Sequence, residues 1–560
     1  MASRALGAVL IWSLDSLGKK LLKLGQKLKF YIRAIHSFRG KQMTKLTFYG
    51  GLGEVGGNKI LLEDRDTRLW LDFGLSFGQK GEFYGDFMGP RSKGGIRDLL
   101  RMGLIPRLDG IYRDDLVHVP KIDNALRELG IEDTSYWTPQ LQSYGDVLKR
   151  DGKSWLTGVL LTHAHIDHCG YIPYLDPRVP IYCSEVTLRV LETMDEISWD
   201  EFTKVKPWRA DRIKRGAFPG KPTIKRGNEV ARGFKIFTPG DILKIGGLRV
   251  QTFTVDHSIL GAVAYLITTS DGKRVLYTGD FRFHGRQAEA TKRFQEAVKG
   301  LEPDVMISEG TRVDETEPDS EERVQAECTE LVSKTKGFVG VDFAWKDLTR
   351  FETLREAARA GGKTFAISAR TAYLLNKLGR GGEVEGDPKV KVYVPRKGSM
   401  LYSLGDYTRS KYFAGFSSDW EEGGPDTRHL KDGIRAYQIK ADPSRYLVYL
   451  SFWDFNELID LQPPEGGLFV SASSEPYDEE GMIEEERKKA WMRRFKLNPP
   501  GHELLHVHAS GHVSGVELKA FVREIKPRQL FPVHTEHAGE FKGLAGQVHE
   551  EIKLREPYEI

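Results

Sequence analysis

The chain has 560 residues, of which 40% are hydrophobic and 29% charged, and this composition excludes a fibrous or wholly disordered protein. A length prior of ~150 residues per domain predicts two to four domains. The chain has only three cysteines, which excludes a disulfide framework and favours a reducing compartment, so we expect a cytoplasmic protein. The net charge is +4, but residues 1–42 carry nine basic residues and one acidic residue, which leaves −4 for the remainder. Binding of nucleic acid would therefore need a local basic groove.

The first 42 residues form a basic N-terminal extension. Residues 5–14 are an apolar run, but ten residues are fewer than the ~20 that a membrane-spanning helix needs, so we expect no integral membrane segment. Residues 17–35 predict a basic amphipathic helix. Three interpretations stay open: docking to a membrane surface or a partner, export, or an appendage of little function that precedes a folded domain beginning at Met43.

The pattern of predicted strands and helices in the remaining chain changes near residue 321. Before it, short apolar segments predict strands, with a helix at 185–197 between them; the strands lie at 45–51, 68–74, 154–161, 249–258, 262–269, 274–281 and 305–310. After it, helices alternate with strands, which is typical of parallel-sheet units; the helices lie at 322–334, 348–361 and 371–379, and the strands at 337–343 and 364–369. The last 115 or so residues add further segments: strands at 446–452, 466–473 and 529–537, and helices at 484–497 and 516–526.

A histidine cluster follows the apolar segment at 154–161. Three imidazoles and one carboxylate occur within six residues, at His163, His165, Asp167 and His168. Such a cluster of polar side chains would lower the stability of the folded protein if no metal bound it. Neutral imidazole and carboxylate are both suitable ligands for zinc. Because side chains on a turning loop diverge, the four ligands can face two adjacent metal positions.

Further candidate ligands lie at the ends of other apolar runs, at His257, Asp280 and His534. A single histidine at a strand end is more often structural than metal-binding. With the cluster present, we expect these three side chains to complete the metal centre.

These motifs resemble known families. HAHIDH, followed by His257, Asp280 and His534, resembles the metallo-β-lactamase superfamily, and Asp72 matches the structural aspartate of that superfamily. The segments around Glu309 (SEG), His512 (HASGHVS) and His534 (PVHTEH) resemble motifs A, B and C of its β-CASP nuclease branch, and the opening GGLGEVGGN is similar to ribonuclease J. The chain departs from that pattern because Thr535 replaces a usual glycine and because residues 75–157 match none of its motifs. Since only 26 residues follow His534, we also expect the C-terminal domain of ribonuclease J to be absent.

The resemblance implies an α/β fold, the four-layer αβ/βα metallo-β-lactamase sandwich with an inserted βα cap. The expected organisation is an extension at 1–42, the first part of the sandwich at 43–315, the β-CASP domain at 316–475, and the completion of the sandwich at 476–560.

The resemblance also implies the roles of the site residues. One metal would bind His163, His165 and His257, the other Asp167, His168 and His534, and Asp280 would bridge them. Two Zn²⁺ ions are expected, with Mn²⁺ or Mg²⁺ as alternatives, and an activated hydroxide would attack phosphorus. Asp167, Glu309 and His512 are the implied catalytic residues, with His512 protonating the leaving oxygen.

Other polar residues are candidates for substrate contact: Ser473, Ser474, Ser510, Gly511 and Ser514. Ordinary turn serines are the competing interpretation. The stretch at 204–226 is basic and contains Trp208 and Phe218, so it could border a cleft for RNA, whereas a solvated surface is the alternative.

We therefore predict a two-zinc ribonuclease that hydrolyses single-stranded RNA, exo- or endonucleolytically, as a monomer or homodimer. Two alternatives stay open. A metallo-β-lactamase-fold hydrolase of a small ester or thioester would share the histidine cluster but would not need the cap. A non-catalytic RNA-binding paralogue would have lost ligands, whereas every expected position is filled here.

Overall fold

The computed structural model describes residues 43–560, except 86–87, 199–200, 206, 216–219, 318–319, 404–430, 475, 477–478 and 500. The amphipathic helix expected at 17–35 and the aromatic Phe218 lie outside the described residues. No helix in the described part of the chain is both long and apolar enough to cross a membrane.

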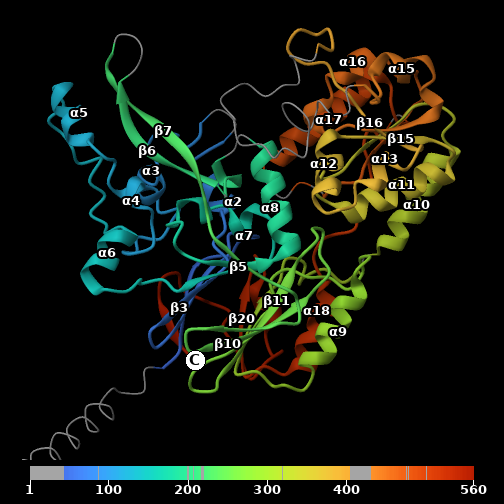
Figure 1. Ribbon diagram of the computed structural model, residues 1–560. Helices are drawn as coiled ribbons and strands as arrows, with labels where there is room; N and C mark the ends of the chain where they lie inside the picture. The colour runs from blue at the N-terminus through green and yellow to red at the C-terminus, as the bar shows by residue number, and fades with distance from the viewer. Residues whose placement is uncertain are drawn as a thin grey trace, which may run out of the picture. The chain divides into compact units, whose positions relative to one another are not determined.

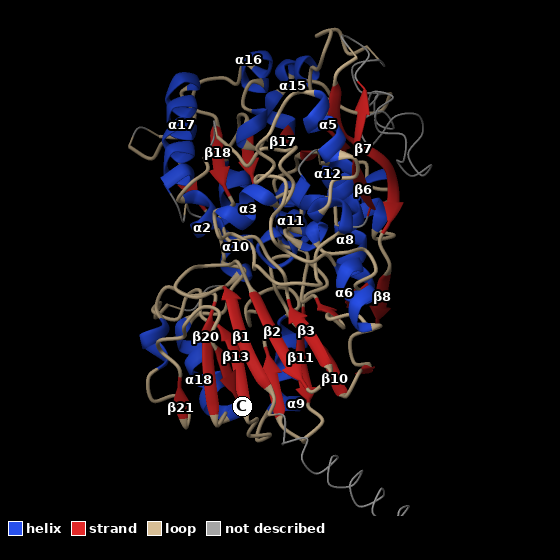
Figure 2. Ribbon diagram, turned by 90° about the vertical axis from the view of Figure 1, so that its left-hand side faces the viewer, coloured by secondary structure: helices blue, strands red, loops and turns tan. Residues whose placement is uncertain are grey.

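The first sheet has seven strands, and their order mixes the two ends of the chain. Its strands β1, β2 and β3 are labelled in Figure 2. In spatial order they are β22 (Pro557–Glu559), β1 (Lys45–Gly50), β2 (Lys59–Asp64), β3 (Thr67–Leu71), β4 (Gly158–Leu160), β5 (Ile181–Ser184) and β8 (Phe234–Phe237). Pairing is antiparallel from β22 to β3 and parallel from β3 to β8.

The second sheet also has seven strands. In spatial order they are β21 (Gln547–Val548), β20 (Gln529–Val533), β13 (Val305–Glu309), β12 (Arg274–Tyr277), β11 (Val263–Thr268), β10 (Leu248–Thr254) and β9 (Ile242–Ile245). The strands from β9 to β12 are antiparallel, and those from β12 to β21 are parallel.

A hydrophobic core joins the two sheets, and alternation along the strands explains it. In β3, Leu69 and Leu71 pack into the core shared with the second sheet, whereas Trp70 faces the opposite side. Helices α9 (Ala288–Val298) and α18 (Gly515–Ile525) cover the outer face of the second sheet. Because strand side chains alternate between faces, this pattern buries both faces of each sheet. The result is the expected four-layer αβ/βα sandwich.

The third sheet has six parallel strands and takes its chain from residues 339–506, so it extends beyond the boundary expected at residue 475. In spatial order its strands are β16 (Val390–Val392), β15 (Thr364–Ile367), β17 (Tyr446–Tyr449), β14 (Val339–Asp342), β18 (Leu468–Ser471) and β19 (Leu505–His506). Its helices are α10 (Glu321–Lys334), α11 (Leu348–Ala360), α12 (Ala369–Lys377), α13 (Gly382–Glu385), α15 (Ala436–Ala441), α16 (Glu457–Leu461) and α17 (Glu479–Phe495).

Short helices form most of the segment at 75–157, in which the sequence analysis found no motif. They are α2 (Phe77–Gly81), α3 (Arg97–Arg101), α4 (Asp114–Val117), α5 (Ile122–Glu128) and α6 (Tyr144–Asp151). Helices α7 (Ile166–Cys169) and α8 (Glu185–Ile197) follow, and a two-stranded antiparallel arm is formed by β6 (Pro207–Arg215) and β7 (Pro222–Ala231). In Figure 1 the arm rises on the same side as α3 to α6.

Candidate metal centre

The candidate ligands gather because six strands of the two packed sheets deliver polar residues at their carboxyl ends. Those residues are Asp72 after β3, His163 after β4, His257 after β10, Asp280 after β12, Glu309 at the end of β13 and His534 after β20. The loop after β4 runs directly into α7, which adds Asp167 and His168. Residues as much as 462 positions apart, Asp72 and His534, thus meet at one edge of the sandwich.

Asp72 fixes the loop that carries His163 and His168. Its backbone has a φ of 58°, in the left-handed region. One carboxylate oxygen accepts the Thr162 amide at 2.8 Å, and the other accepts the hydroxyls of Thr162 and Tyr277 at 2.8 and 2.7 Å. The same oxygen lies 2.7 Å from His168 Nδ1, which leaves Nε2 of that ring directed into the cluster.

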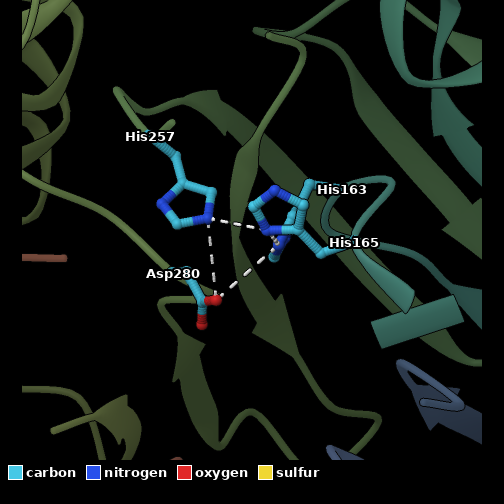
Figure 3. Close-up of side chains that lie close together, drawn as sticks. All are labelled: His163, His165, His257 and Asp280. Atoms are coloured by element: carbon cyan, nitrogen blue, oxygen red, sulfur yellow. Dashed lines mark hydrogen bonds and ion pairs between the residues drawn. The ribbon is translucent and has the colours of Figure 1, made fainter. Parts of the chain in front are cut away.

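The first group of donor atoms comes from His163, His165, His257 and Asp280, which turn toward one another in Figure 3. His165 Nδ1 lies 3.1 Å from His163 Nε2 and 3.1 Å from His257 Nε2. Asp280 Oδ2 lies 3.6 and 3.8 Å from those two Nε2 atoms. The outward nitrogen of His257, Nδ1, donates to the Gly511 carbonyl at 2.6 Å, which fixes the ring.

The second group comes from Asp167, His168, Asp280 and His534. Asp280 Oδ2 lies 3.0 Å from His168 Nε2 and 3.4 Å from His534 Nε2. Asp167 Oδ2 lies 3.1 Å from His534 Nε2 and 3.6 Å from His168 Nε2. One oxygen of Asp280 therefore belongs to both groups.

These spacings fit metal ions. Donors bound at ~2.0–2.1 Å around one tetrahedral ion stand about 3.3 Å apart, and the eight pairs above range from 3.0 to 3.8 Å. Three buried atoms of the cluster, His168 Nε2 and both carboxylate oxygens of Asp280, have no hydrogen-bond partner. Because a buried polar atom without a partner lowers stability, these atoms fit a site that binds a cation.

The protonation states of the first group suit metal binding. Burial lowers the pKa of His163 and His257 well below the usual value, and burial lowers the pKa of His165 to about 3. These imidazoles are therefore neutral near pH 7, which is the form that binds a metal.

Glu309 and His512 form a pair beside the cluster. Glu309 Oε2 lies 2.9 Å from His512 Nδ1, and its other oxygen accepts the Phe281 amide at 2.7 Å. The Thr311 hydroxyl donates to Glu309 at 3.0 Å and lies 3.1 Å from His512 Nδ1 and 2.9 Å from His534 Nδ1. The sequence interpretation missed Thr311, because a threonine two residues beyond a strand carries no signal of its own.

The five candidate substrate-contact residues do not share one location. Ser473 and Ser474 line a cavity of about 850 Å³ in the third-sheet region, apart from the histidine cluster. Gly511 lies against the cluster, since a Cβ there would stand 3.0 Å from His257. Ser510 borders it and accepts the His512 amide with its hydroxyl at 3.1 Å.

Ser514 does not reach the cluster. Its side chain is completely buried, and its hydroxyl donates to Glu517 and accepts the Glu517 amide as the N-cap of α18. The sequence contained a signal for this role, because Ser-x-x-Glu before an apolar run is a capping-box pattern.

Comparisons with known proteins agree with this geometry. A model of the beta-lactamase superfamily domain matches residues 138–337, and a model of the Zn-dependent metallo-hydrolase RNA specificity domain matches residues 503–552. Ribonuclease J of Thermus thermophilus is 25% identical over 89% of this chain and 69% of its own, and that of Sinorhizobium meliloti is 24% identical over 68% and 58%. A crystal structure of a protein of unknown function from Enterococcus faecalis covers 92% of this chain and all of its own, with a TM-score of 0.60 at 21% identity.

The fold is the metallo-β-lactamase sandwich, and residues 138–337 match the beta-lactamase superfamily domain. Over most of its length the chain is similar to ribonuclease J, and this similarity agrees with the β-CASP resemblance of its motifs. The chain spans more than half of the length of these two ribonuclease J relatives, and part of each relative lies outside the match.

Proposed function

We propose that the protein is a metal-dependent ribonuclease that hydrolyses phosphodiester bonds of single-stranded RNA. The observation that carries this proposal is the convergence of two metal-spaced donor groups with a carboxylate–imidazole pair, Glu309 and His512, at one edge of the sandwich. The relatives named ribonuclease J and the match to an RNA specificity domain support RNA as the substrate.

Two Zn²⁺ ions are the proposed cofactors. His163, His165 and His257 would hold one, Asp167, His168 and His534 the other, and Asp280 would contribute to both. A donor set dominated by imidazole suits zinc better than magnesium, which prefers oxygen ligands. When bound, the ions supply positive charge that lowers the pKa of the attacking water and offsets the charge of the phosphate.

His512 supplies the proton that the leaving 3′ oxygen needs. Glu309 accepts a hydrogen bond from Nδ1 of the His512 ring, so Nε2 is the nitrogen available to the substrate. Gly511 keeps the adjacent backbone close to His257, because a side chain at this position would collide with that ring and with Ser258. The pair therefore holds one proton donor against the edge of the metal cluster.

Cleavage of labelled RNA tests the proposal. The zinc-loaded protein should cleave a 5′-labelled single-stranded RNA but not the matching DNA, and a circular RNA without ends distinguishes endonucleolytic cleavage. His163→Ala and His512→Ala should each lower kcat by about 10²-fold or more, whereas His118→Ala, at an exposed ion pair with Asp146, should not. The proposal fails if both cluster-side variants cleave at the wild-type rate.

We also place the protein in the cytoplasm, because its three cysteines are buried and unpaired in the described structure. The homodimer and the docking role of residues 1–42 stay predictions.

A further inference from the structure

The arm formed by β6 and β7 is the most basic part of the described chain. Residues 204–232 contain ten lysines and arginines and only two acidic residues, although residues 43–560 as a whole have a net charge of −4. The arm therefore concentrates positive charge on an otherwise acidic body.

One face of the arm presents these charges without acidic partners. Arg212 lies directly opposite Lys225 in the antiparallel register, and Lys214, two residues further, shares the face of Arg212. All three are exposed, as is Lys221, and none has an ion-pair partner among the described residues. Like charges directly opposite each other destabilise a β-pair, so this face is costly in the isolated protein.

The opposite face of the arm is different. Arg215, which alternation places away from Arg212 and Lys214, forms an ion pair with Glu128 of α5 at 2.9 Å. Among the arm's cations whose side chains the structure describes, the exposed and unpaired Arg212, Lys214 and Lys225 therefore lie on one face.

The root of the arm is fixed close to the metal loop. Arg232 is buried and donates to the carbonyls of Leu175, Asp176 and Val205 at 2.8–3.0 Å. Leu175 ends the short helical turn Ile172–Tyr174, which comes three residues after α7, the helix of Asp167 and His168. The arm is thus anchored on the segment that leaves the metal cluster.

A second anchor lies one residue before the charged face. The amide of Asp211 donates to Asp115 at 2.7 Å, and Arg113 holds that carboxylate in a two-contact ion pair at 2.6 and 3.0 Å. At ~3.3 Å per residue, the nine residues of β6 span about 30 Å. Asp211 is the fifth of these nine residues, so the strand continues for four residues, about 13 Å, beyond this anchor and carries Arg212 and Lys214 there.

We propose that this face of the arm docks the phosphate backbone of the RNA substrate outside the metal centre. The inference rests on the proposed function and names the part of the substrate that the arm recognises, a polyphosphate backbone several nucleotides from the scissile bond. Lysine and arginine neutralise phosphates and release counterions, which repays the cost of the unpaired charges. A long RNA gains affinity from the arm, whereas a short RNA, held by the metal edge alone, does not.

The sandwich provides a matched control. Lys244 and Arg249 are also exposed basic residues directly opposite each other in an antiparallel pair, between β9 and β10. Arg249 lies at the start of β10, whereas His257 follows the end of that strand. The control pair therefore has the same local chemistry but stands at the far end of the sheet from the cluster.

The test measures binding of a fluorescein-labelled 30-nucleotide oligouridine by anisotropy as the salt concentration is raised. All variants carry His512→Ala, which slows cleavage during the measurement. Arg212→Gln/Lys225→Gln removes two phosphate contacts, so the slope of log K against log salt should become shallower by ~1.4, equivalent to about 25-fold weaker binding at 0.1 M salt. Lys244→Gln/Arg249→Gln should leave the slope unchanged, and Arg212→Lys, which keeps the charge, should do the same. Melting temperatures of all variants verify folding.

Cleavage of a four-nucleotide RNA with His512 intact separates this inference from the proposed function. The arm variant should cleave that RNA at the wild-type rate; if the wild type does not cleave it, the proposed function fails irrespective of the binding result. Equal losses in the arm and control variants, or no loss in either, would overturn the inference. So would loss of binding to phosphatidylserine vesicles with RNA binding intact, because the arm would then recognise a membrane.

Discussion

Arg350 links the third-sheet region to the loop that carries His512, and its replacement by methionine is our most informative prediction. The side chain is completely buried on α11. Its guanidinium donates to four acceptors: Glu321 at 3.0 Å, and the carbonyls of Ala472, Val507 and Ala509 at 3.1, 3.0 and 3.3 Å. Two of these carbonyls precede His512 by five residues or fewer, so the guanidinium fixes the backbone that leads to this proton donor.

The expected cost follows from what the substitution leaves behind. Arg350→Met leaves Glu321 with Arg282 as its remaining partner at 3.1 Å, and deprives three buried carbonyls of a donor. Removing one partner of a buried ion pair costs about 3–5 kcal/mol. We expect a fall of that size in the free energy of unfolding, and about a 10²-fold fall in kcat, since a catalytic group displaced by ~1 Å loses that much.

Urea unfolding followed by tryptophan fluorescence, together with the rate of RNA cleavage, measures both effects. Arg350→Met/Glu321→Gln should be less destabilised than the sum of its single variants, with a coupling of ~1–3 kcal/mol, because the buried carboxylate that lost one of its two arginine partners is gone. Arg359→Met on the same helix removes a half-exposed pair with Asp387 and should cost at most about 1 kcal/mol. If Arg350→Met behaves like Arg359→Met in both assays, the buried link has no such role.

Three further predictions concern the metal centre and the root of the arm. Chelation should abolish RNA cleavage and lower Tm, and added zinc should restore both. The change in Tm is expected because a metal that binds only the folded state stabilises that state. Unchanged cleavage by the metal-free protein would contradict the metal site. Gly74→Ala should lower zinc content measured by mass spectrometry, since a Cβ there would stand 1.5 Å from the Asp167 carbonyl oxygen, whereas Gly81→Ala, with no atom within 4 Å, should retain it. Burial, followed by the neighbouring carboxylate of Asp115, raises the pKa of Asp211 to about 6 from an unfolded value of 3.8. A raised folded pKa means that stability is lost as pH rises through 6, so Asp211→Asn should raise the unfolding free energy at pH 7.5 by up to about 3 kcal/mol more than at pH 4. Equal gains at the two pH values would show that the carboxyl is not buried as described.

The metal centre was predictable from the sequence because each candidate ligand directly follows an apolar run. His257, Asp280 and His534 lie at such positions, and the carboxyl ends of parallel strands meet at one edge of a sheet. The four-layer sandwich came from the resemblance. Strands such as β3 alternate, with Trp70 on one face and its leucine neighbours on the other. This alternation is consistent with the four-layer sandwich once the pairing of the strands is known.

Other features depended on pairings that one sequence does not contain. The arm was seen only as a charged stretch, because its partner strand and its register, with Arg212 opposite Lys225, follow from tertiary structure. Thr311 and Arg350 act through partners about 120 to 220 positions away, so no local pattern marks them. Ser514 is the opposite case, because the sequence around it contains a capping pattern that predicts its observed role as an N-cap. The prediction of substrate contact depended instead on its position two residues after His512.

The backbone conformation of two residues at the cluster shows how the surrounding structure positions the candidate metal ligands. Asp72 and His534 both adopt left-handed conformations, at φ of 58° and 55°, which cost of order 1 kcal/mol or more for non-glycine residues. Each is fixed by neighbours: Asp72 by four contacts to its carboxylate, and His534 by its amide, which donates to the Gly51 carbonyl at 2.8 Å. Such strain persists only where the surrounding structure over-determines the conformation. The sandwich therefore holds these two strand ends, and the candidate ligands on and beside them, in position.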